Sequence, residues 1–162
     1  MEDGATYLEN ARIKAQALVE LTGKAAIADD SGIEIDALEG APGVRSARFA
    51  GPGATDEDNN RKMADLLDGV PPERRTARYR CVTLLLLPDG TQLEGEGTCE
   101  GRIALAPRGA NGFGYDPWFI PAEQDGKLTF GELPLEFKHG ISHRGRALRQ
   151  LADRLQRSGI LG

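Results

Sequence analysis

A run of acidic and hydroxyl side chains, Asp29-Asp30-Ser31-Gly32, follows a short apolar stretch and offers carboxylates that could hold a metal ion. Successive side chains of a strand point to opposite faces, so at most one of the two aspartates can face a given site. A carboxylate before a glycine turn suits Mg²⁺, which favours one or two carboxylates together with substrate phosphates. The alternative is an Asx-turn that only begins the following loop. These residues alone leave both interpretations open.

A glycine-rich aromatic segment occupies residues 109–117, with the sequence Gly-Ala-Asn-Gly-Phe-Gly-Tyr-Asp-Pro. The glycines beside Phe113 would let a flat ligand reach the ring and the backbone amides, and Asp116 could accept hydrogen bonds from a base. Stacking of a base on an aromatic ring contributes about 1–3 kcal/mol. The alternative is a tight surface loop whose aromatic side chains pack inward. Trp118 and Phe119, which follow it, are expected in the core.

A basic segment runs from Lys138 to Arg146 and contains both histidines of the chain, His139 and His143. Ser142 is a candidate N-cap. His143 and Arg144 would then lie in the first turn of a helix, where a cation costs about 0.3–1 kcal/mol against the helix dipole. This placement suggests that they point at an anion or a polar ligand. A solvated basic face is the alternative, and it suits the remaining arginines better, namely Arg146, Arg149, Arg154 and Arg157.

Glu9 has a structural interpretation of its own. It is the fourth residue of a T-x-x-E capping box that begins at Thr6, and such a cap stabilises a helix by about 1 kcal/mol. No Ser/His/Asp or Cys/His arrangement is evident, and no Walker-type phosphate loop is present.

The elements that must position these residues alternate between helical and extended patterns. We expect a helix from Thr6 to Gly23, a second helix from Thr55 to near Gly69, and a third from about Ser142 to Arg157. Expected strands cover 25–28, 33–37, 76–87, 93–99 and 103–105, with a glycine-rich loop over 40–54. This order predicts an α/β fold with a mixed, elongated and twisted sheet flanked by helices.

The composition is that of an ordinary globular protein. Its 162 residues favour one domain over 1–162. The net charge of -5 lacks the basic footprint of a nucleic-acid binder. No apolar run approaches a membrane span, and the start at Met1 does not resemble a signal peptide, so we expect a cytoplasmic protein that binds neither membrane nor nucleic acid. Cys81 and Cys99 have no metal or redox spacing, and Cys81 is expected to be buried in a strand.

Together these segments resemble the inosine-triphosphatase family of non-standard purine nucleoside-triphosphate pyrophosphatases. The resemblance extends over essentially the whole chain, in the order of the family. Its matching stretches are Gly4-Ala5-Thr6-Tyr7-Leu8-Glu9-Asn10-Ala11, Lys14-Ala15, Ala28-Asp29-Asp30-Ser31-Gly32, Gly40-Ala41-Pro42-Gly43-Val44, Ser46-Ala47-Arg48, Ala54-Thr55-Asp56 with Asn60, Gly112-Phe113-Gly114-Tyr115-Asp116-Pro117, and Lys138 with Ile141-Ser142-His143-Arg144-Gly145.

The resemblance implies Mg²⁺-dependent hydrolysis of ITP, dITP or XTP to the monophosphate and pyrophosphate, by a homodimer that cleanses the nucleotide pool. It implies that Glu9 and Asp30 bind the metal and that Asp30 is the base that activates water. It also implies a group of substrate-binding residues: Ser31, Phe113, Gly114, Tyr115, Asp116, Lys138, His143 and Arg144.

The chain departs from the family pattern at its beginning. The family starts with a strand, an S/T-x-N-x-x-K loop that holds the triphosphate, and a helix, and this sequence starts after that unit. One alternative to the active enzyme is therefore a nucleotide-binding or dimerisation module without turnover. A separate alternative is a pyrophosphatase for pyrimidine or methylated nucleotides, against which the matches at His143-Arg144 and Phe113–Asp116 argue.

Overall fold

A computed structural model describes residues 4–160, which form two compact units. Unit 1 comprises the residues up to Ser31, Arg80–Thr98 and the residues from His143 onward, and unit 2 comprises Gly32–Tyr79 and Cys99–Ser142. The expectation of one domain over 1–162 stays a prediction. Met1, on which the argument about a signal peptide depended, lies outside the described residues.

A four-stranded antiparallel sheet contributes to both units. Its strands are β1 (Ala26–Ile35), β2 (Thr76–Leu86), β3 (Gln92–Ile103) and β4 (Phe119–Pro121), in that spatial order. The register of the last pair places Ile103 opposite Phe119 and Gly101 opposite Pro121. The prediction of an α/β fold is therefore confirmed, and the sheet is antiparallel where a mixed sheet was expected.

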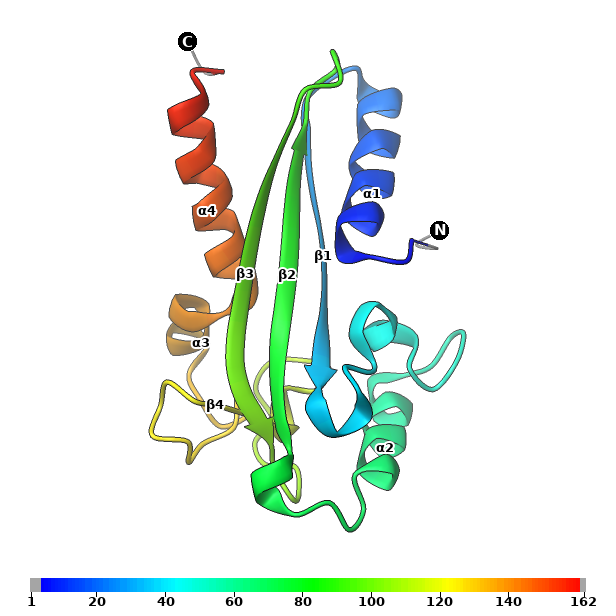
Figure 1. Ribbon diagram of the computed structural model, residues 1–162, viewed down its shortest axis with the longest axis vertical. Helices are drawn as coiled ribbons and strands as arrows, with labels where there is room; N and C mark the ends of the chain where they lie inside the picture. The colour runs from blue at the N-terminus through cyan, green and yellow to red at the C-terminus, as the bar shows by residue number, and fades with distance from the viewer. Residues whose placement is uncertain (1–3, 161–162) are drawn as a thin grey trace. The chain divides into compact units, whose positions relative to one another are not determined.

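Two helices flank the strands of unit 1, α1 (Tyr7–Thr22) and α4 (His143–Ser158), and they lie on opposite sides of those strands (Figure 1). α1 begins as expected, since the Thr6 hydroxyl accepts the Glu9 backbone N–H at 3.1 Å. It ends at Gly23, whose φ of 65° is in the left-handed region that glycine adopts without strain. Its buried Ala11 and Ala15 pack against the strands through Ala28 and Leu84.

The other helix of unit 1 lies close to β3 because two glycines leave room for its backbone. A Cβ added at Gly95 would lie 2.2 Å from the carbonyl oxygen of Ala147. A Cβ added at Gly97 would lie equally close, 2.2 Å, to the carbonyl oxygen of His143. Gly97 thus sets how closely the first turn of α4 approaches the sheet.

Unit 2 has helices α2 (Asp56–Leu66) and α3 (Leu135–Ile141) and four 3-10 turns over Asp36–Leu38, Gly43–Arg48, Pro72–Arg74 and Asp116–Trp118. The capping box of α2 is confirmed, with Thr55 and Asp58 bonded reciprocally. The core of this unit contains most of its buried apolar side chains, including Ile33, Ile35, Met63, Leu67, Tyr79, Phe119 and Phe130. Trp118 packs against that core, so the prediction for Trp118 and Phe119 is also confirmed.

The prediction of a turn at Asp29-Asp30-Ser31-Gly32 is wrong, because β1 runs through it without interruption. Gly32 allows the backbone of Gly43 to lie close to the strand and does not form a turn. A Cβ at Gly32 would lie 2.1 Å from the carbonyl oxygen of Gly43. The Ser46 hydroxyl accepts the Ile33 N–H at 2.9 Å beside that approach. The Asx-turn interpretation is therefore excluded.

Two further boundaries differ from expectation. The predicted strand over 103–105 is not separate, because β3 extends to Ile103. The chain before α4 forms the additional helix α3, which the sequence did not predict because seven residues are too few for helical periodicity to be recognised. Ser142 separates the two helices, with an extended ψ of 148°.

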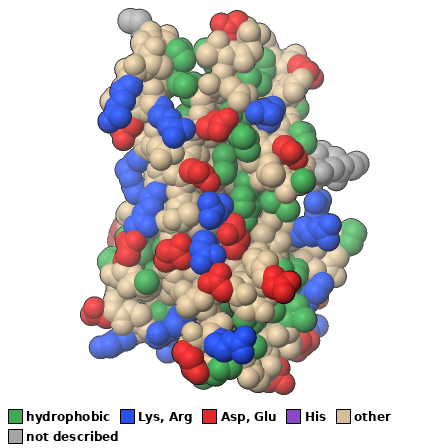
Figure 2. All heavy atoms as spheres, in the orientation of Figure 1, with side chains coloured by type: hydrophobic (Ala, Val, Ile, Leu, Met, Phe, Trp, Pro, Cys, Tyr) green, Lys and Arg blue, Asp and Glu red, His purple; other side chains and the backbone are tan. Residues whose placement is uncertain are grey.

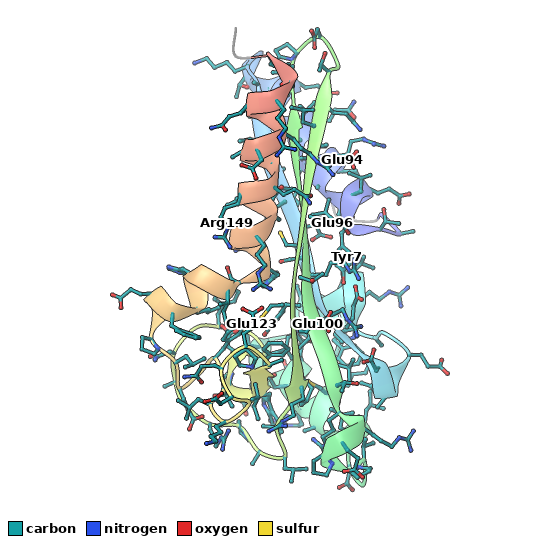
Figure 3. The ribbon with its side chains drawn as sticks, turned by 60° about the vertical axis from the view of Figure 1, so that its left-hand side comes forward. Tyr7, Glu94, Glu96, Glu100, Glu123 and Arg149 are labelled. Atoms are coloured by element: carbon teal, nitrogen blue, oxygen red, sulfur yellow. The ribbon has the colours of Figure 1, made fainter. Side chains whose placement is uncertain are left out.

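Charges of both signs are interleaved along the strands, as Figure 2 shows for one face. In unit 2 Arg78 contacts Asp36 at 3.1 Å and Glu100 at 3.0 Å, and in unit 1 Arg80 contacts Glu96 at 3.2 Å. Glu96 and Glu100 both lie on β3, four residues apart (Figure 3). No continuous basic surface results on this face. Among residues 4–160, moreover, no helix combines the length and apolar character needed to cross a membrane.

The expected solvated basic face of α4 exists in part. Arg149 is exposed and points away from the strands (Figure 3). Arg146 and Arg154 instead donate to backbone carbonyls of β3, those of Thr98 and Glu94, at 2.8 Å each. These two arginines therefore have structural roles in holding α4 to the sheet.

Candidate active site

Asp30 is the most enclosed acidic side chain among the described residues of unit 1. It is 8% exposed, and its Oδ2 accepts a hydrogen bond from Asn10 Nδ2 at 2.9 Å. Lys14 Nζ lies 3.8 Å from Oδ1. Asn10 is itself held in place, because its Oδ1 accepts the Gly4 N–H at 2.8 Å. One helix face of α1 therefore supplies an amide and an ammonium to a carboxylate on β1, and the orientation of that carboxylate is fixed.

Glu9 precedes Asn10 on α1 and is exposed. Its Oε2 accepts the backbone N–H of Ala5 at 2.7 Å, so the side chain helps to hold the start of the helix. The Thr6 half of the predicted capping box is confirmed. The reciprocal half is wrong, because the Glu9 carboxylate accepts the N–H of Ala5 and not that of Thr6. The metal-binding role stays a prediction.

The residues around Asp30 fit one kind of metal better than another. The described part of the chain contains no group of three or more His, Cys, Asp or Glu side chains placed to hold an ion. A structural zinc site needs about four such ligands. Mg²⁺, in contrast, keeps several waters and is bound by one or two carboxylates together with substrate phosphates. Glu9 and Asp30 match the type and number of protein ligands of such a Mg²⁺ site, and their role as metal ligands stays a prediction.

Asp29 faces the opposite side of β1. Its Oδ2 accepts a hydrogen bond from Arg144 Nε at 2.8 Å, and Cys81 Sγ lies 3.6 Å from the same oxygen. Burial raises the pKa of the Cys81 thiol to about 12, so the thiol stays protonated and can donate to the carboxylate. The prediction that only one aspartate of the pair can face a given site is confirmed. Ser31 shares the face of Asp29 by strand alternation.

His143 and Arg144 are the first two residues of α4, as predicted. The Arg144 side chain is 50% exposed and Asp29 is 34% exposed, so this ion pair is accessible to a ligand. The carboxylate offsets the cost of placing a cation at a helix N-terminus.

In unit 2 a buried carboxylate joins the aromatic loop to α3. Asp116 is 3% exposed, and its Oδ2 accepts the Phe113 N–H at 3.1 Å and a hydrogen bond from Lys138 Nζ. Its Oδ1 accepts the Tyr79 hydroxyl at 3.0 Å. Lys138 is therefore part of a buried ion pair, and the interpretation of the basic segment as a solvated face is wrong for this residue.

Phe113 is 68% exposed, so the interpretation in which the loop aromatics pack inward is wrong for this ring. Lys138 Nζ lies 4.7 Å from its centroid. The next residue, Gly114, is held from two directions: its N–H donates to Asp56 Oδ2 and its carbonyl accepts from Asn60 Nδ2, each at 2.9 Å. The loop borders an open cleft of about 490 Å³ that includes Trp118. A flat ligand can therefore reach Phe113.

Tyr115 behaves differently from its neighbours in the loop. It is 5% exposed, belongs to the core of unit 2 and donates its hydroxyl to the Ser46 carbonyl at 2.7 Å. Burial raises the pKa of this phenol, which stays protonated. Its side chain holds the loop to the core, and only its backbone remains available to a ligand.

Sequence reasoning assigned no role to several residues that hold these side chains. They are Asn10, Asp56, Asn60 and Tyr79. For Asp29 it considered metal binding but not the bond to Arg144. Asn10, Asp56 and Asn60 lie within the motifs quoted for the family resemblance. Nothing in the neighbouring sequence indicated what their polar side chains would bond. Tyr79 had no signal, because an aromatic residue in a buried strand is ordinary core.

The fold is that of a known class of α/β proteins. The solved structure of a HAM1 protein from Coxiella burnetii superposes with a TM-score of 0.88 at 43% identity, covering 97% of this chain and 80% of that one. The Ham1 protein of Staphylococcus aureus gives the same TM-score of 0.88 at 40% identity, covering 98% of this chain and 80% of that one.

The sequence comparison agrees, and the chain belongs to the Ham1 family, which it matches over residues 1–154. The dITP/XTP pyrophosphatase of Desulforamulus reducens is 53% identical over 156 residues, which are 96% of this chain and 77% of that protein. The dITP/XTP pyrophosphatase of Nitratidesulfovibrio vulgaris is 52% identical over 158 residues, covering 94% of this chain and 75% of that protein.

Proposed function

We propose that this protein hydrolyses non-standard purine nucleoside triphosphates (ITP, dITP and XTP) to the monophosphate and pyrophosphate, with Mg²⁺, and so cleanses the nucleotide pool. The observation that carries the proposal is the buried Asp30 carboxylate, held by Asn10 and Lys14 in a chain about half identical to dITP/XTP pyrophosphatases. The family resemblance assigns the metal and base roles to this same residue.

The chemistry follows from that position. Hydrolysis breaks the bond between the α and β phosphates, an oxygen of water bonds to phosphorus, and pyrophosphate leaves. Asp30 accepts the proton of the attacking water, while Asn10 keeps the carboxylate oriented. When bound by Glu9 and Asp30, Mg²⁺ would neutralise charge on the phosphates, which is the main requirement of phosphoryl transfer.

Recognition of the base is assigned to residues that can donate to a 6-oxo group. Lys138 offers a charged donor beside Phe113, on which the base would stack. His143 and Arg144 are further donors, and Ser31 and the loop from Phe113 to Asp116 complete the proposed substrate-binding set. Adenine has an amino group where hypoxanthine has an oxygen, and a buried donor left unpaired costs about 1–3 kcal/mol.

We also propose that the protein acts as a cytoplasmic homodimer, as the resemblance implies. Size-exclusion chromatography with light scattering would test the dimer, because a mass near twice 17.4 kDa is expected.

The test is pyrophosphate release from ITP, with ATP in parallel, by the wild-type chain and by Asp30→Ala in the presence of Mg²⁺. Fast release from ITP, slow release from ATP and no release by the folded variant would support the proposal. Binding of IMP without any release of pyrophosphate would instead favour the alternative, a nucleotide-binding or dimerisation module without turnover. Preference for a pyrimidine triphosphate would overturn the assigned specificity.

A further inference from the structure

Tyr79 lies on β2, within unit 2, and its ring packs against two other aromatic rings of the core. The residue is 7% exposed. Its ring centroid is 4.6 Å from that of Phe119, with an interplanar angle of 58°, and 6.1 Å from that of Phe130. Tight packing on both aromatic rings fixes the direction of the phenol C–O bond. The position of the hydroxyl is therefore fixed by this packing.

In this position the hydroxyl contacts the carboxylate of Asp116. The Tyr79 hydroxyl donates to Oδ1 at 3.0 Å, while Oδ2 accepts the Phe113 N–H at 3.1 Å and a hydrogen bond from Lys138 Nζ. The two oxygens thus bind different parts of the unit. Oδ1 bonds the core residue Tyr79, and Oδ2 bonds the aromatic loop at Phe113 and the side chain of Lys138.

Because Asp116 and Lys138 are both buried, their hydrogen bonds to the protein determine where the two side chains lie. Asp116 is 3% exposed and Lys138 is 7% exposed, so water can replace little of what the protein supplies. A buried ion pair is stable only when its remaining hydrogen-bonding capacity is satisfied. The Lys138 ammonium also lies 4.7 Å from the ring centroid of Phe113 and 5.6 Å from that of Phe130. A rotation of the carboxylate would therefore move the ammonium relative to the exposed ring.

The geometry leaves little freedom for a substitute arrangement. A Cβ added at Gly112, whose φ is +75°, would lie 2.1 Å from Asp116 Oδ2, so the backbone closes the space beside that oxygen. Burial and the nearby Asp116 charge raise the pKa of Tyr79 well above its ordinary value, and its hydroxyl remains a donor at every pH at which the protein would be assayed.

We propose that Tyr79 is a positioning residue for base selection, which holds Asp116 Oδ1 so that Oδ2 places Lys138 for the purine 6-oxo group. The proposal rests on the proposed function, because it concerns how the same enzyme distinguishes ITP from ATP. Tyr79 itself contacts neither the base nor the phosphates. It acts through Asp116.

The variant Tyr79→Phe tests this, because it keeps the ring and removes only the hydroxyl. We expect kcat/KM for ITP to fall about tenfold, the loss expected for one hydrogen bond to a charged group. The fall should appear mainly in KM, and kcat/KM for ATP should change little, so the ratio between the substrates falls. IMP binding by calorimetry should weaken by a similar factor.

Thr129→Val is the matched control. Thr129 is fully buried in the same unit and donates its hydroxyl to the Arg108 carbonyl at 2.6 Å, with no bond to Asp116. A purely structural effect would lower ITP and ATP turnover alike in both variants, and that outcome would overturn the proposal. An unchanged ratio of ITP to ATP in folded Tyr79→Phe would also overturn it.

A crystal structure of the wild-type chain with IMP decides the matter if Tyr79→Phe does not fold. The proposal requires the Tyr79–Asp116 hydrogen bond to persist while Lys138 Nζ contacts the 6-oxo oxygen. A broken Tyr79–Asp116 bond, or a base whose 6-oxo oxygen is far from Lys138, would overturn it. Absence of ITP turnover and IMP binding in the wild type would instead refute the proposed function.

Discussion

Asp29 on β1 and Arg144 at the start of α4 are 115 positions apart in the sequence, and a hydrogen bond of 2.8 Å joins them. Asp29 is adjacent to Asp30, yet the two carboxylates contact different helices. Asp30 contacts α1 through Asn10. One strand therefore presents a candidate catalytic carboxylate on one face and a guanidinium-orienting carboxylate on the other.

Asp29→Asn tests whether the second carboxylate orients Arg144. Loss of the charge-assisted bond should raise KM for ITP several-fold and leave kcat nearly unchanged. The pair is partly exposed, so the cost in the free energy of unfolding should be below about 1 kcal/mol. Steady-state kinetics and urea unfolding would measure both. Asp153→Asn serves as the control, because Asp153 is an exposed aspartate on α4, the helix that carries Arg144. Equal kinetics in the two variants would show that Asp29 does not orient Arg144.

Asp30→Ala should abolish turnover without unfolding the protein. The substitution removes an enclosed carboxylate near Lys14. With it the protein loses the proposed proton acceptor for the attacking water and a proposed metal ligand. Circular dichroism would verify the fold while pyrophosphate release is measured. Wild-type activity in the folded variant would refute the assignment of Asp30.

Two substitutions separate the helix-capping role of Glu9 from its proposed metal-binding role. Glu9→Gln keeps an oxygen that can accept the Ala5 N–H, whereas Glu9→Ala removes it. Both variants should need more Mg²⁺ for half-maximal turnover. Only Glu9→Ala should also lose stability, by about 1 kcal/mol, as expected for a helix cap. A Mg²⁺ titration identical to that of the wild type in Glu9→Gln would leave Glu9 with the cap alone.

Gly97→Ala should destabilise the protein by about 1–3 kcal/mol, because its Cβ would overlap the carbonyl oxygen of His143. Gly140→Ala is the control, since a Cβ there meets no atom within 4 Å and alanine is favoured by about 1 kcal/mol in a helix. Urea midpoints would compare the two. Equal midpoints would show that α4 can move away from β3 at no cost.

Local patterns in the sequence were sufficient for the features that depend on residues a few positions apart. The caps at Thr6 and Thr55 follow from such spacing, and both are confirmed. The opposite orientation of Asp29 and Asp30 follows from the alternation of a strand, which also depends only on neighbours. The family could be recognised for a related reason, because its motifs are short and their order lies along the chain.

Features that depend on packing between distant segments were beyond the reach of the sequence. Gly32 suggested a turn, and only the approach of Gly43 reveals why a glycine stands inside a continuous strand. The burial of Lys138 required α3, which is too short to leave a periodic pattern.

Tyr79 shows the difference most clearly. By sequence it is one apolar residue in a buried strand, and 37 positions separate it from Asp116. The sequence by itself determined the family, the main helices and the residue types of the site. Which donor serves which oxygen was decided only by the tertiary structure, because hydrogen-bond geometry depends on side chains that packing brings together from separate elements.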